Sequence, residues 1–240
     1  MDISVVVPIY NEERRVATAL FELNSYLESH FNRFEIIVID DASEDGTLAV
    51  LKELPFPSLR IFSFSEHHGR GGAVRYGCAQ TYSCDYVVIF DADLSVSPTV
   101  IGQLVKTARD TDTPFVFTSP VNSFNGYNRR LSTRRFQQLA SALLGISWVA
   151  CGTKCLLSSF ARSVVSKTKT NSSGIDTELV YLAREFGIRP IEIAPVTRER
   201  EQKGNGLYFP SDFFTLLKIR RLAARGAYTI ENIKEWGGNV

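Results

Sequence analysis

The sequence predicts an α/β fold with a mostly parallel central sheet and helices on both of its faces. Through the first 95 residues, short β-branched and aromatic runs alternate with segments of helical periodicity, as in repeated strand–helix units. Three of these runs end in polar, mostly acidic clusters. The chain has 240 residues, 44% of them hydrophobic, which is enough for one large α/β domain with a sizeable core.

Four short apolar runs predict the strands of the amino-terminal half, at residues 3–9, 34–39, 59–64 and 86–90. Such runs are typical of buried strands in a parallel sheet, and the crossovers between them are right-handed. A helix is expected after each of the first three runs. Asn11 is expected to cap the first helix, and a glycine-rich turn precedes the third, at 73–81.

The pattern is less regular beyond the fourth strand. It predicts helices at 100–108, 134–144 and 175–186, and strands at 114–118, 148–157 and 188–196. The last strand should lie at an edge of the sheet, because two prolines interrupt it. Residues 123–130 are expected to be irregular, and the polar segment 166–174 is a candidate mobile cover.

The predicted domain covers residues 1–210, and an amphipathic helical tail covers residues 211–240. Within the tail, aromatic and aliphatic side chains stand beside basic ones at 213–224. This mixture fits a helix that lies on an anionic membrane surface. A helix docked on the domain, or on a second subunit in a homo-oligomer, fits equally well.

Composition and targeting signals narrow the classes of function. A net charge of +1 gives no support to a general nucleic-acid binder, which normally carries a basic excess. The four cysteines lack the partners of a zinc site, and we interpret them as buried thiols in a reducing compartment. The sequence shows neither a signal peptide nor an apolar stretch of membrane-spanning length. We expect a soluble cytoplasmic protein, or one that is peripheral at the cytoplasmic face of a membrane.

Asp91 and Asp93 follow the fourth predicted strand, with one residue between them. Ligands of open α/β sheets bind beyond the carboxyl ends of the strands, so both carboxylates are expected at a ligand-binding rim. Their hard oxygen atoms suit Mg²⁺ or Mn²⁺. Taken alone, the pair also fits a strand that ends in solvated aspartates. Similar polar clusters follow the first two strands, at 10–12 and 40–45.

The same rim carries groups that a nucleotide requires. Tyr10 can pack against a base, and Asp40 or Asp41 can accept hydrogen bonds from base N–H groups or ribose hydroxyls. Arg70 and Arg75 can neutralise phosphate charge. The glycine turn before them matches neither a P-loop nor a dinucleotide-binding fingerprint. Its glycines also fit a tight turn with close strand–helix packing, which requires no ligand.

Four motifs, at 7–13, 40–47, 69–75 and 91–95, occur in an order that resembles a known family. Together they resemble the inverting family-two glycosyltransferases of the GT-A fold, in the branch of dolichyl- and polyprenyl-phosphate sugar synthases. The resemblance covers about residues 3–198, and segments 151–154 and 175–179 resemble later motifs of the same branch.

The resemblance implies a hexosyltransferase with a nucleotide-diphosphate sugar donor, either UDP-glucose-like or GDP-mannose-like. The hexose would pass with inversion to a dolichyl or polyprenyl phosphate. Asp91 and Asp93 would hold Mg²⁺ or Mn²⁺, which stabilises the leaving diphosphate. The implied donor-binding residues are Pro8, Tyr10, Glu12, Asp40, Asp41, Arg70, Asp91 and Ala92.

The resemblance also implies an acceptor site at an arginine-rich segment. Arg129, Thr133 and Arg134 match the positions that meet the lipid phosphate, although such clusters also occur at solvated helix starts. A phosphate acceptor is already ionised, so a strong general base is dispensable. The expected catalytic residues are Asp93, Asp176 and Arg129.

Asp176 would orient the donor or the acceptor, with Glu178 supporting it, although a helix-capping role also fits Asp176. Two other functions remain open: a family-two enzyme that uses Asp176 as the base toward a glycan hydroxyl, and a non-catalytic nucleotide-sugar-binding protein. The chain departs from the family pattern at three places. Ser95 stands where many relatives have Gln, Thr118-Ser119-Pro120 replaces Gly-Ser-Arg, and Arg70 replaces Lys.

Overall fold

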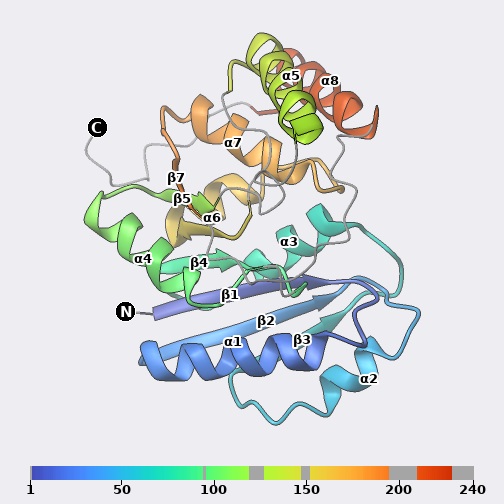
Figure 1. Ribbon diagram of the computed structural model, residues 1–240, viewed down its shortest axis with the longest axis vertical. Coiled ribbons are helices and arrows are strands. Elements are labelled where there is room, and N and C mark those ends of the chain that lie inside the picture. Colours follow the sequence, from blue (N-terminus) through green and yellow to red (C-terminus); the bar gives the residue numbers. More distant parts are fainter. Residues whose placement is uncertain (1, 94–95, 119–126, 147–151, 195–209, 229–240) are drawn as a thin grey trace.

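The computed structural model describes residues 2–93, 96–118, 127–146, 152–194 and 210–228 (Figure 1). Within 127–135 and 210–212 it describes the backbone alone. The strands are β1 (Asp2–Ile9), β2 (Arg33–Asp40), β3 (Leu59–Ser63), β4 (Tyr86–Ile89), β5 (Phe115–Thr118), β6 (Lys154–Leu157) and β7 (Ile191–Ile193). The helices are α1 (Val16–His30), α2 (Thr47–Lys52), α3 (Arg70–Ala79), α4 (Val100–Asp110), α5 (Tyr127–Leu144), α6 (Ser158–Val165), α7 (Ile175–Glu185) and α8 (Pro210–Ala224).

The strands of the described chain form one sheet in the order β3-β2-β1-β4-β6-β5-β7. The first four strands pair in parallel, and β5 pairs in parallel with β7. β6 runs antiparallel to both of its neighbours, β4 and β5. The predicted α/β fold with a mostly parallel sheet is confirmed, and β7 lies at an edge, as its prolines predict.

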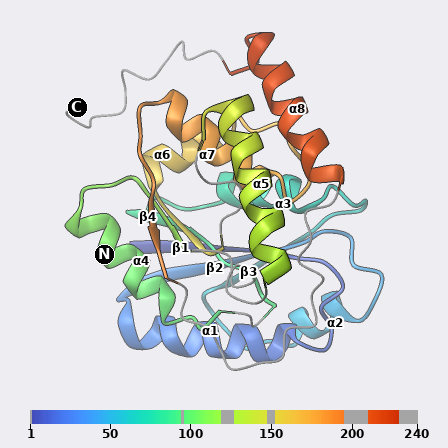
Figure 2. The ribbon, with the colours of Figure 1, turned by 45° about the horizontal axis from the view of Figure 1, so that its top comes forward.

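Helices cover both faces of the sheet (Figure 1). The apolar sides of α1, α2 and α4 pack on one face, and those of α3, α6 and α7 pack on the other. α5 and α8 lie side by side on the outer side of this second layer (Figures 1 and 2). The apolar positions that predict α1, Val16, Leu20, Leu23 and Leu27, are all fully buried. Each such side chain stabilises the fold by about 1.5–3 kcal/mol.

The topology brings several chain segments to one edge of the sheet. β1, β2 and β4 are parallel, so the residues after Ile9, Asp40 and Ile89 all emerge there. β6 is antiparallel, and for that reason its first residue, Lys154, lies at this same edge, paired with Ile89. The amino terminus of α3 follows β3 at the same edge, because β3 is parallel to β2. The clusters predicted to share a rim therefore meet.

The structure corrects several local predictions. Asn11 does not cap α1: it has a positive φ of 54° and its side chain accepts a hydrogen bond from the Glu44 N–H. The helix instead begins at Val16, without a side-chain cap. Residues 127–130, expected to be irregular, belong to α5, and α6 was not predicted at all.

The remaining expectations concern the cysteines, membrane-spanning segments and residues outside the described ranges. Cys78 and Cys155 are buried free thiols, as interpreted from the sequence, whereas Cys84 is a free thiol that is only half-buried. In the described chain, no helix is both long and apolar enough to span a membrane. Ser95, Ser119, Pro120, Cys151 and the chain beyond residue 228 lie outside the described residues.

Candidate active site

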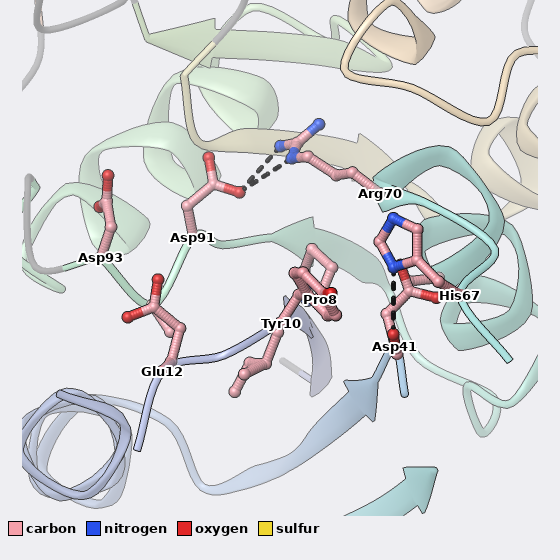
Figure 3. Close-up of a pocket in the computed structure, with 11 residues that line it drawn as sticks. Pro8, Tyr10, Glu12, Asp41, His67, Arg70, Asp91 and Asp93 are labelled. Carbon is pink, nitrogen blue, oxygen red and sulfur yellow. Dashed lines mark hydrogen bonds and ion pairs between the residues drawn. The ribbon is translucent and has the colours of Figure 1, made fainter. Parts of the chain in front are cut away.

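A cavity of about 350 Å³ opens at the carboxyl edge of β1, β2 and β4 (Figure 3). It is lined by Pro8, Ile9, Tyr10, Glu12, Asp41, His67, Arg70, Ala73, Asp91, Ala92 and Asp93. These residues come from the last two positions of β1, from the segments after β1, β2 and β4, and from the turn before α3 and the first residues of that helix. Every residue predicted to bind the donor lines the cavity except Asp40, and the predicted metal ligand Asp93 lines it too.

Arg70 joins two acidic side chains, Asp91 in the cavity and Asp176 beyond its lining. Its Nε and Nη2 atoms donate to Asp91 Oδ1 at 3.2 and 2.9 Å, and its Nη1 atom donates to Asp176 Oδ1 at 2.9 Å. Burial opposes the charge of Arg70, but Asp176 and Asp91 outweigh it and raise the pKa of the guanidinium. Arg70 is therefore a permanent cation at the centre of the site.

The carboxyl group of Asp91 is ionised for the complementary reason. Its burial alone would raise the pKa, yet the charges of Arg70 and Lys154, with the Arg70 hydrogen bonds, hold the pKa below its ordinary value. Asp91 and Asp93 both extend into the cavity, and Glu12 approaches from the other side (Figure 3). This part of the cavity is acidic, and Arg70 is the cation beside Asp91.

Asp176 lies in the first turn of α7 and faces the sheet. Besides Arg70, its Oδ1 atom meets Lys154 Nζ at 2.9 Å, and the Lys154 side chain is fully buried. Lys154 also donates to the Gly152 carbonyl at 2.7 Å. The N-cap position of α7 is Gly174, so Asp176 does not cap the helix. Its carboxylate instead links the start of β6 to Arg70.

The opposite end of the cavity carries aromatic rings and a second carboxylate. Asp41 is almost fully buried, and its Oδ1 atom accepts a hydrogen bond from the His68 N–H at 2.7 Å. His67 Nδ1 lies 3.1 Å from Asp41 Oδ2 and 3.2 Å from the Asp41 carbonyl oxygen. His67 in turn packs against the ring of Tyr10, with ring centroids 4.5 Å apart. Tyr10 is 41% exposed, so its ring is available to a planar ligand.

Two of the residues predicted to bind the sugar donor, Asp40 and Glu12, accept hydrogen bonds from other residues of the chain. Asp40 accepts from the Ser43 N–H at 3.2 Å and from the Ser63 hydroxyl at 2.8 Å, and it is 1% exposed. Of the two adjacent aspartates, Asp41 therefore borders the cavity, while Asp40 fixes the turn after β2. Glu12 lines the cavity, but both of its carboxylate oxygens accept from Arg15 at 2.7 Å.

The glycine turn at the start of α3 packs tightly against residues 168–171, which we call the strap. The Gly71 N–H donates to the Asn171 carbonyl at 2.7 Å, and a Cβ atom on Gly71 would come within 2.0 Å of the Thr170 carbonyl. These glycines therefore do allow close packing, as the alternative without a ligand expects, where the turn contacts the strap. Arg75 faces the strap and donates to the Thr170 carbonyl at 2.7 Å, so its expected phosphate role has no support here.

The cavity offers some, but not all, of the ligands that a divalent cation needs. Its carboxylates are hard oxygen ligands, which Mg²⁺ and Mn²⁺ prefer. However, the described residues hold no group of three or more His, Cys, Asp or Glu side chains placed to bind a metal. Such ions commonly bind through one or two carboxylates together with substrate phosphates. Asp91 and Asp93 fit that arrangement.

The predicted acceptor residues Arg129, Thr133 and Arg134 lie on α5, in the part where only the backbone is described. α5 packs beside α8 (Figure 2), and both helices lie above α7 in the view of Figure 1. Their role as phosphate ligands stays a prediction. The same holds for Arg129 as a catalytic residue.

Two titratable residues of the site, His67 and Lys154, are not among the residues predicted from the sequence. His67 lines the cavity next to Asp41, and its position directly before the glycine turn was a usable signal. Lys154 supplies a buried cation to Asp176. In the sequence, Lys154 is a charged residue beside an apolar run. Its position at the site, however, depends on β6 running antiparallel to β4.

Comparison with known proteins agrees with this fold. Residues 4–164 match the family model described as glycosyl transferase family 2. The chain is 27% identical over 223 residues to the undecaprenyl-phosphate 4-deoxy-4-formamido-L-arabinose transferase of Serratia proteamaculans, covering 92% of this chain and 65% of that protein. It is 28% identical over 214 residues to the dolichyl-phosphate beta-glucosyltransferase of Homo sapiens, covering 80% and 66%. The chain thus spans just under two thirds of the length of these relatives.

Solved structures show the same architecture. Glucosyl-3-phosphoglycerate synthase from Mycobacterium tuberculosis in complex with UDP aligns with a TM-score of 0.67 and 20% identity, over 91% of this chain and 80% of that one. The same synthase in complex with Mn²⁺, UDP-glucose and phosphoglyceric acid aligns with a TM-score of 0.66 and 22% identity, over 91% and 79%. At this identity the likeness establishes the fold. With the family match over residues 4–164, it confirms the predicted family and fold: the chain belongs to glycosyl transferase family 2 and has the GT-A fold.

Proposed function

We propose that the protein transfers a hexose from a nucleotide-diphosphate sugar to a polyprenyl or dolichyl phosphate, with inversion at the anomeric carbon. The observation that carries the proposal is the cavity at the carboxyl edge. In it, a family 2 chain combines exposed Tyr10 and buried Asp41 with Asp91, Asp93 and the fixed cation Arg70. The names of the relatives, which include undecaprenyl-phosphate and dolichyl-phosphate transferases, support a lipid phosphate as the acceptor.

The two ends of the cavity suit the two parts of the donor. Tyr10 and His67 offer aromatic faces to the base, and Asp41 offers a buried acceptor to its N–H groups or to the ribose. At the other end, Asp91 and Asp93 would hold Mg²⁺ or Mn²⁺. When bound there, the ion would neutralise charge on the leaving nucleoside diphosphate. Arg70 supplies additional N–H donors to the same phosphates.

A phosphate acceptor fits the rest of the site. An oxygen of the lipid phosphate forms the new bond to the anomeric carbon, while the bond to the nucleoside diphosphate breaks and its electron pair leaves with the diphosphate. The attacking oxygen is already ionised, so no side chain has to remove a proton. Arg129, Thr133 and Arg134 are the residues we assign to the acceptor phosphate, by their match to the family motif.

Asp176 acts in this proposal as a positioning residue. Its Oδ1 atom meets both Arg70 and Lys154, and removal of a substrate proton by this carboxylate would compete with both ion pairs. This arrangement disfavours the alternative in which Asp176 is the general base toward a glycan hydroxyl. It favours a role in orienting Arg70 toward the donor.

The lipid acceptor requires contact with a membrane, and α8 is the surface we assign to it. Phe213, Phe214 and Leu217 are 40, 64 and 38% exposed on this helix. Lys218, Arg220 and Arg221 follow them. Exposed aromatic groups beside basic ones fit an anionic bilayer surface.

The proposal is tested by incubating the purified protein with Mn²⁺ and a panel of labelled UDP- and GDP-sugars. Each donor is offered polyprenyl phosphate in detergent, phosphoglycerate or a soluble glycan. We expect label in the lipid extract with one donor, and no transfer by the Asp93→Asn variant. Transfer only to a water-soluble acceptor would contradict the lipid assignment. If neither transfer nor hydrolysis is detected with any donor, the result would favour a non-catalytic binding protein.

A further inference from the structure

Glu178 is fully buried, although it carries a carboxylate and lies outside the cavity. Its Oε1 and Oε2 atoms accept hydrogen bonds from the backbone N–H groups of Lys169 and Thr170, both at 2.8 Å. Two hydrogen bonds to successive N–H groups fix both the position and the direction of the strap. The side chain of Glu178 therefore decides where residues 168–171 lie.

The strap lies directly against the glycine turn of the donor site. Asn171 accepts the Gly71 N–H at 2.7 Å, and a Cβ atom on Gly69 would come within 2.4 Å of the same Asn171 carbonyl. Arg75 reinforces the contact through the Thr170 carbonyl and the Asn171 side chain. Arg70, between these glycines, is the residue that joins Asp91 to Asp176. A shift of the strap would therefore move Arg70.

A third hydrogen bond to Glu178 comes from the far end of the chain. The hydroxyl of Tyr228, four residues beyond α8, donates to Glu178 Oε1. Tyr228 is 6% exposed, and its burial together with this hydrogen bond raises the pKa of the phenol, which therefore remains a donor. α8 touches the strap as well, because Lys218 Nζ donates to the Lys169 carbonyl at 3.4 Å.

We propose that Glu178 and Tyr228 form a latch through which the carboxyl-terminal helix positions the glycine turn, and with it Arg70, for the donor diphosphate. Both are positioning residues, since neither lines the cavity. The inference rests on the proposed donor site. It also means that the position of α8 affects the donor site: a contact that fixes this helix also fixes the position of the glycine turn and of Arg70.

The chain offers a matched pair of variants to test the latch. Tyr228→Phe removes one hydroxyl and keeps the packed ring. Tyr181→Phe removes a hydroxyl from the adjacent ring, 5.7 Å away between centroids, whose hydrogen-bond partner is Glu185 and not Glu178. Because both variants lose the same atom from neighbouring rings, a difference between them reports the latch and not general packing.

Two readouts are measured on the full chain. Amide hydrogen exchange should become about tenfold faster at Lys169, Thr170 and Gly71 in Tyr228→Phe, and stay within twofold of wild type in Tyr181→Phe. The Kd for UDP or GDP with Mn²⁺, whichever nucleotide the wild type binds, should rise about three- to tenfold in Tyr228→Phe alone.

The outcomes separate the latch from the proposed function. If the wild type binds neither nucleotide, the proposed function fails and the latch has no donor to position. If the wild type binds and Tyr228→Phe matches it in Kd and in exchange, the latch alone is wrong. Equal changes in both variants would also overturn it, because they would reflect packing of the two rings.

Discussion

Replacing Arg70 with methionine removes the guanidinium but keeps an unbranched, flexible apolar side chain that extends to the ε position, so it tests the charge at the centre of the site. Arg70 makes three N–H···O contacts of 2.9 to 3.2 Å, two to Asp91 and one to Asp176. Removing one partner of a fully buried ion pair costs about 3–5 kcal/mol, whereas exposed pairs contribute about 0–1 kcal/mol. The Arg70 pairs lie between these limits.

The exposed fractions and the remaining partners set the magnitude. The side chains of Arg70 and Asp176 are 22 and 11% exposed, but that of Asp91 is 37% exposed and stays partly hydrated. Asp176 also keeps Lys154. We therefore expect Arg70→Met to lower the free energy of unfolding at pH 7 by about 2 kcal/mol. For a chain of this size that corresponds to a fall in Tm of about 4–8 °C.

The pH dependence of this loss tests its electrostatic origin. The folded pKa of Asp91 lies below its ordinary value of 3.8, so the stabilisation from Arg70 is fully present above that value. It disappears as the pH falls through the folded pKa, because the protonated carboxyl no longer attracts the guanidinium. The assay is denaturant unfolding of wild type, Arg70→Met and Arg70→Lys from pH 7 to pH 2.5.

Arg70→Lys should fall between the other two proteins at pH 7, since one ammonium group keeps the charge but cannot span both carboxylates. The stability difference between wild type and Arg70→Met should shrink below about pH 4. A difference that stays constant down to pH 2.5, or no difference at pH 7, would refute the charge-based reasoning.

Three further predictions concern the glycine turn, the buried Lys154–Asp176 ion pair and the reactivity of the thiols. Gly71→Ala should destabilise the fold by about 1–3 kcal/mol in denaturant unfolding, because its methyl group would meet the Thr170 carbonyl; wild-type stability would show that the strap can move aside. Lys154→Met should lower the unfolding free energy by about 2 kcal/mol, since Asp176 loses a fully buried partner and keeps Arg70; a gain in stability would mean that burying the lysine costs more than its ion pair contributes. Burial raises the pKa of the Cys78 thiol to about 12 and raises that of Cys155, so neither should react with a thiol reagent at pH 8 until the protein unfolds, whereas half-buried Cys84 should react before either of them. Peptide mapping of the labelled thiols checks this order, and early labelling of Cys78 would contradict it.

The predictable part of the site follows from strand ends. Pro8, Tyr10, Asp41 and Asp91 stand at or beyond the ends of apolar runs, and parallel strands bring such positions to one edge. Local pattern is sufficient for this because the first four strands alternate with helices. The same logic supports the fold class, which needs only the order of the elements.

The less predictable part depends on contacts between distant segments. Lys154 reaches the site only because β6 inserts antiparallel between β4 and β5. Asp40 and Asp41 are adjacent, and which of them borders the cavity depends on hydrogen bonds to Ser43 and Ser63. Likewise, segment 166–174 reads as a mobile polar loop in sequence, yet Glu178 and the glycine turn hold its residues 169–171.

The proposal that the cavity is a nucleotide-sugar site is tested most directly by calorimetric titration of UDP and GDP with Mn²⁺. The proteins compared are wild type, Asp41→Asn, Asp93→Asn and Asp110→Asn, the last an exposed carboxylate on α4 outside the cavity. We predict that wild type and Asp110→Asn bind one nucleotide equally well. Asp41→Asn and Asp93→Asn should each bind it at least about tenfold more weakly, the loss expected for a charge-assisted contact. Equal affinity in all four proteins, or no binding to the wild type, would contradict the account.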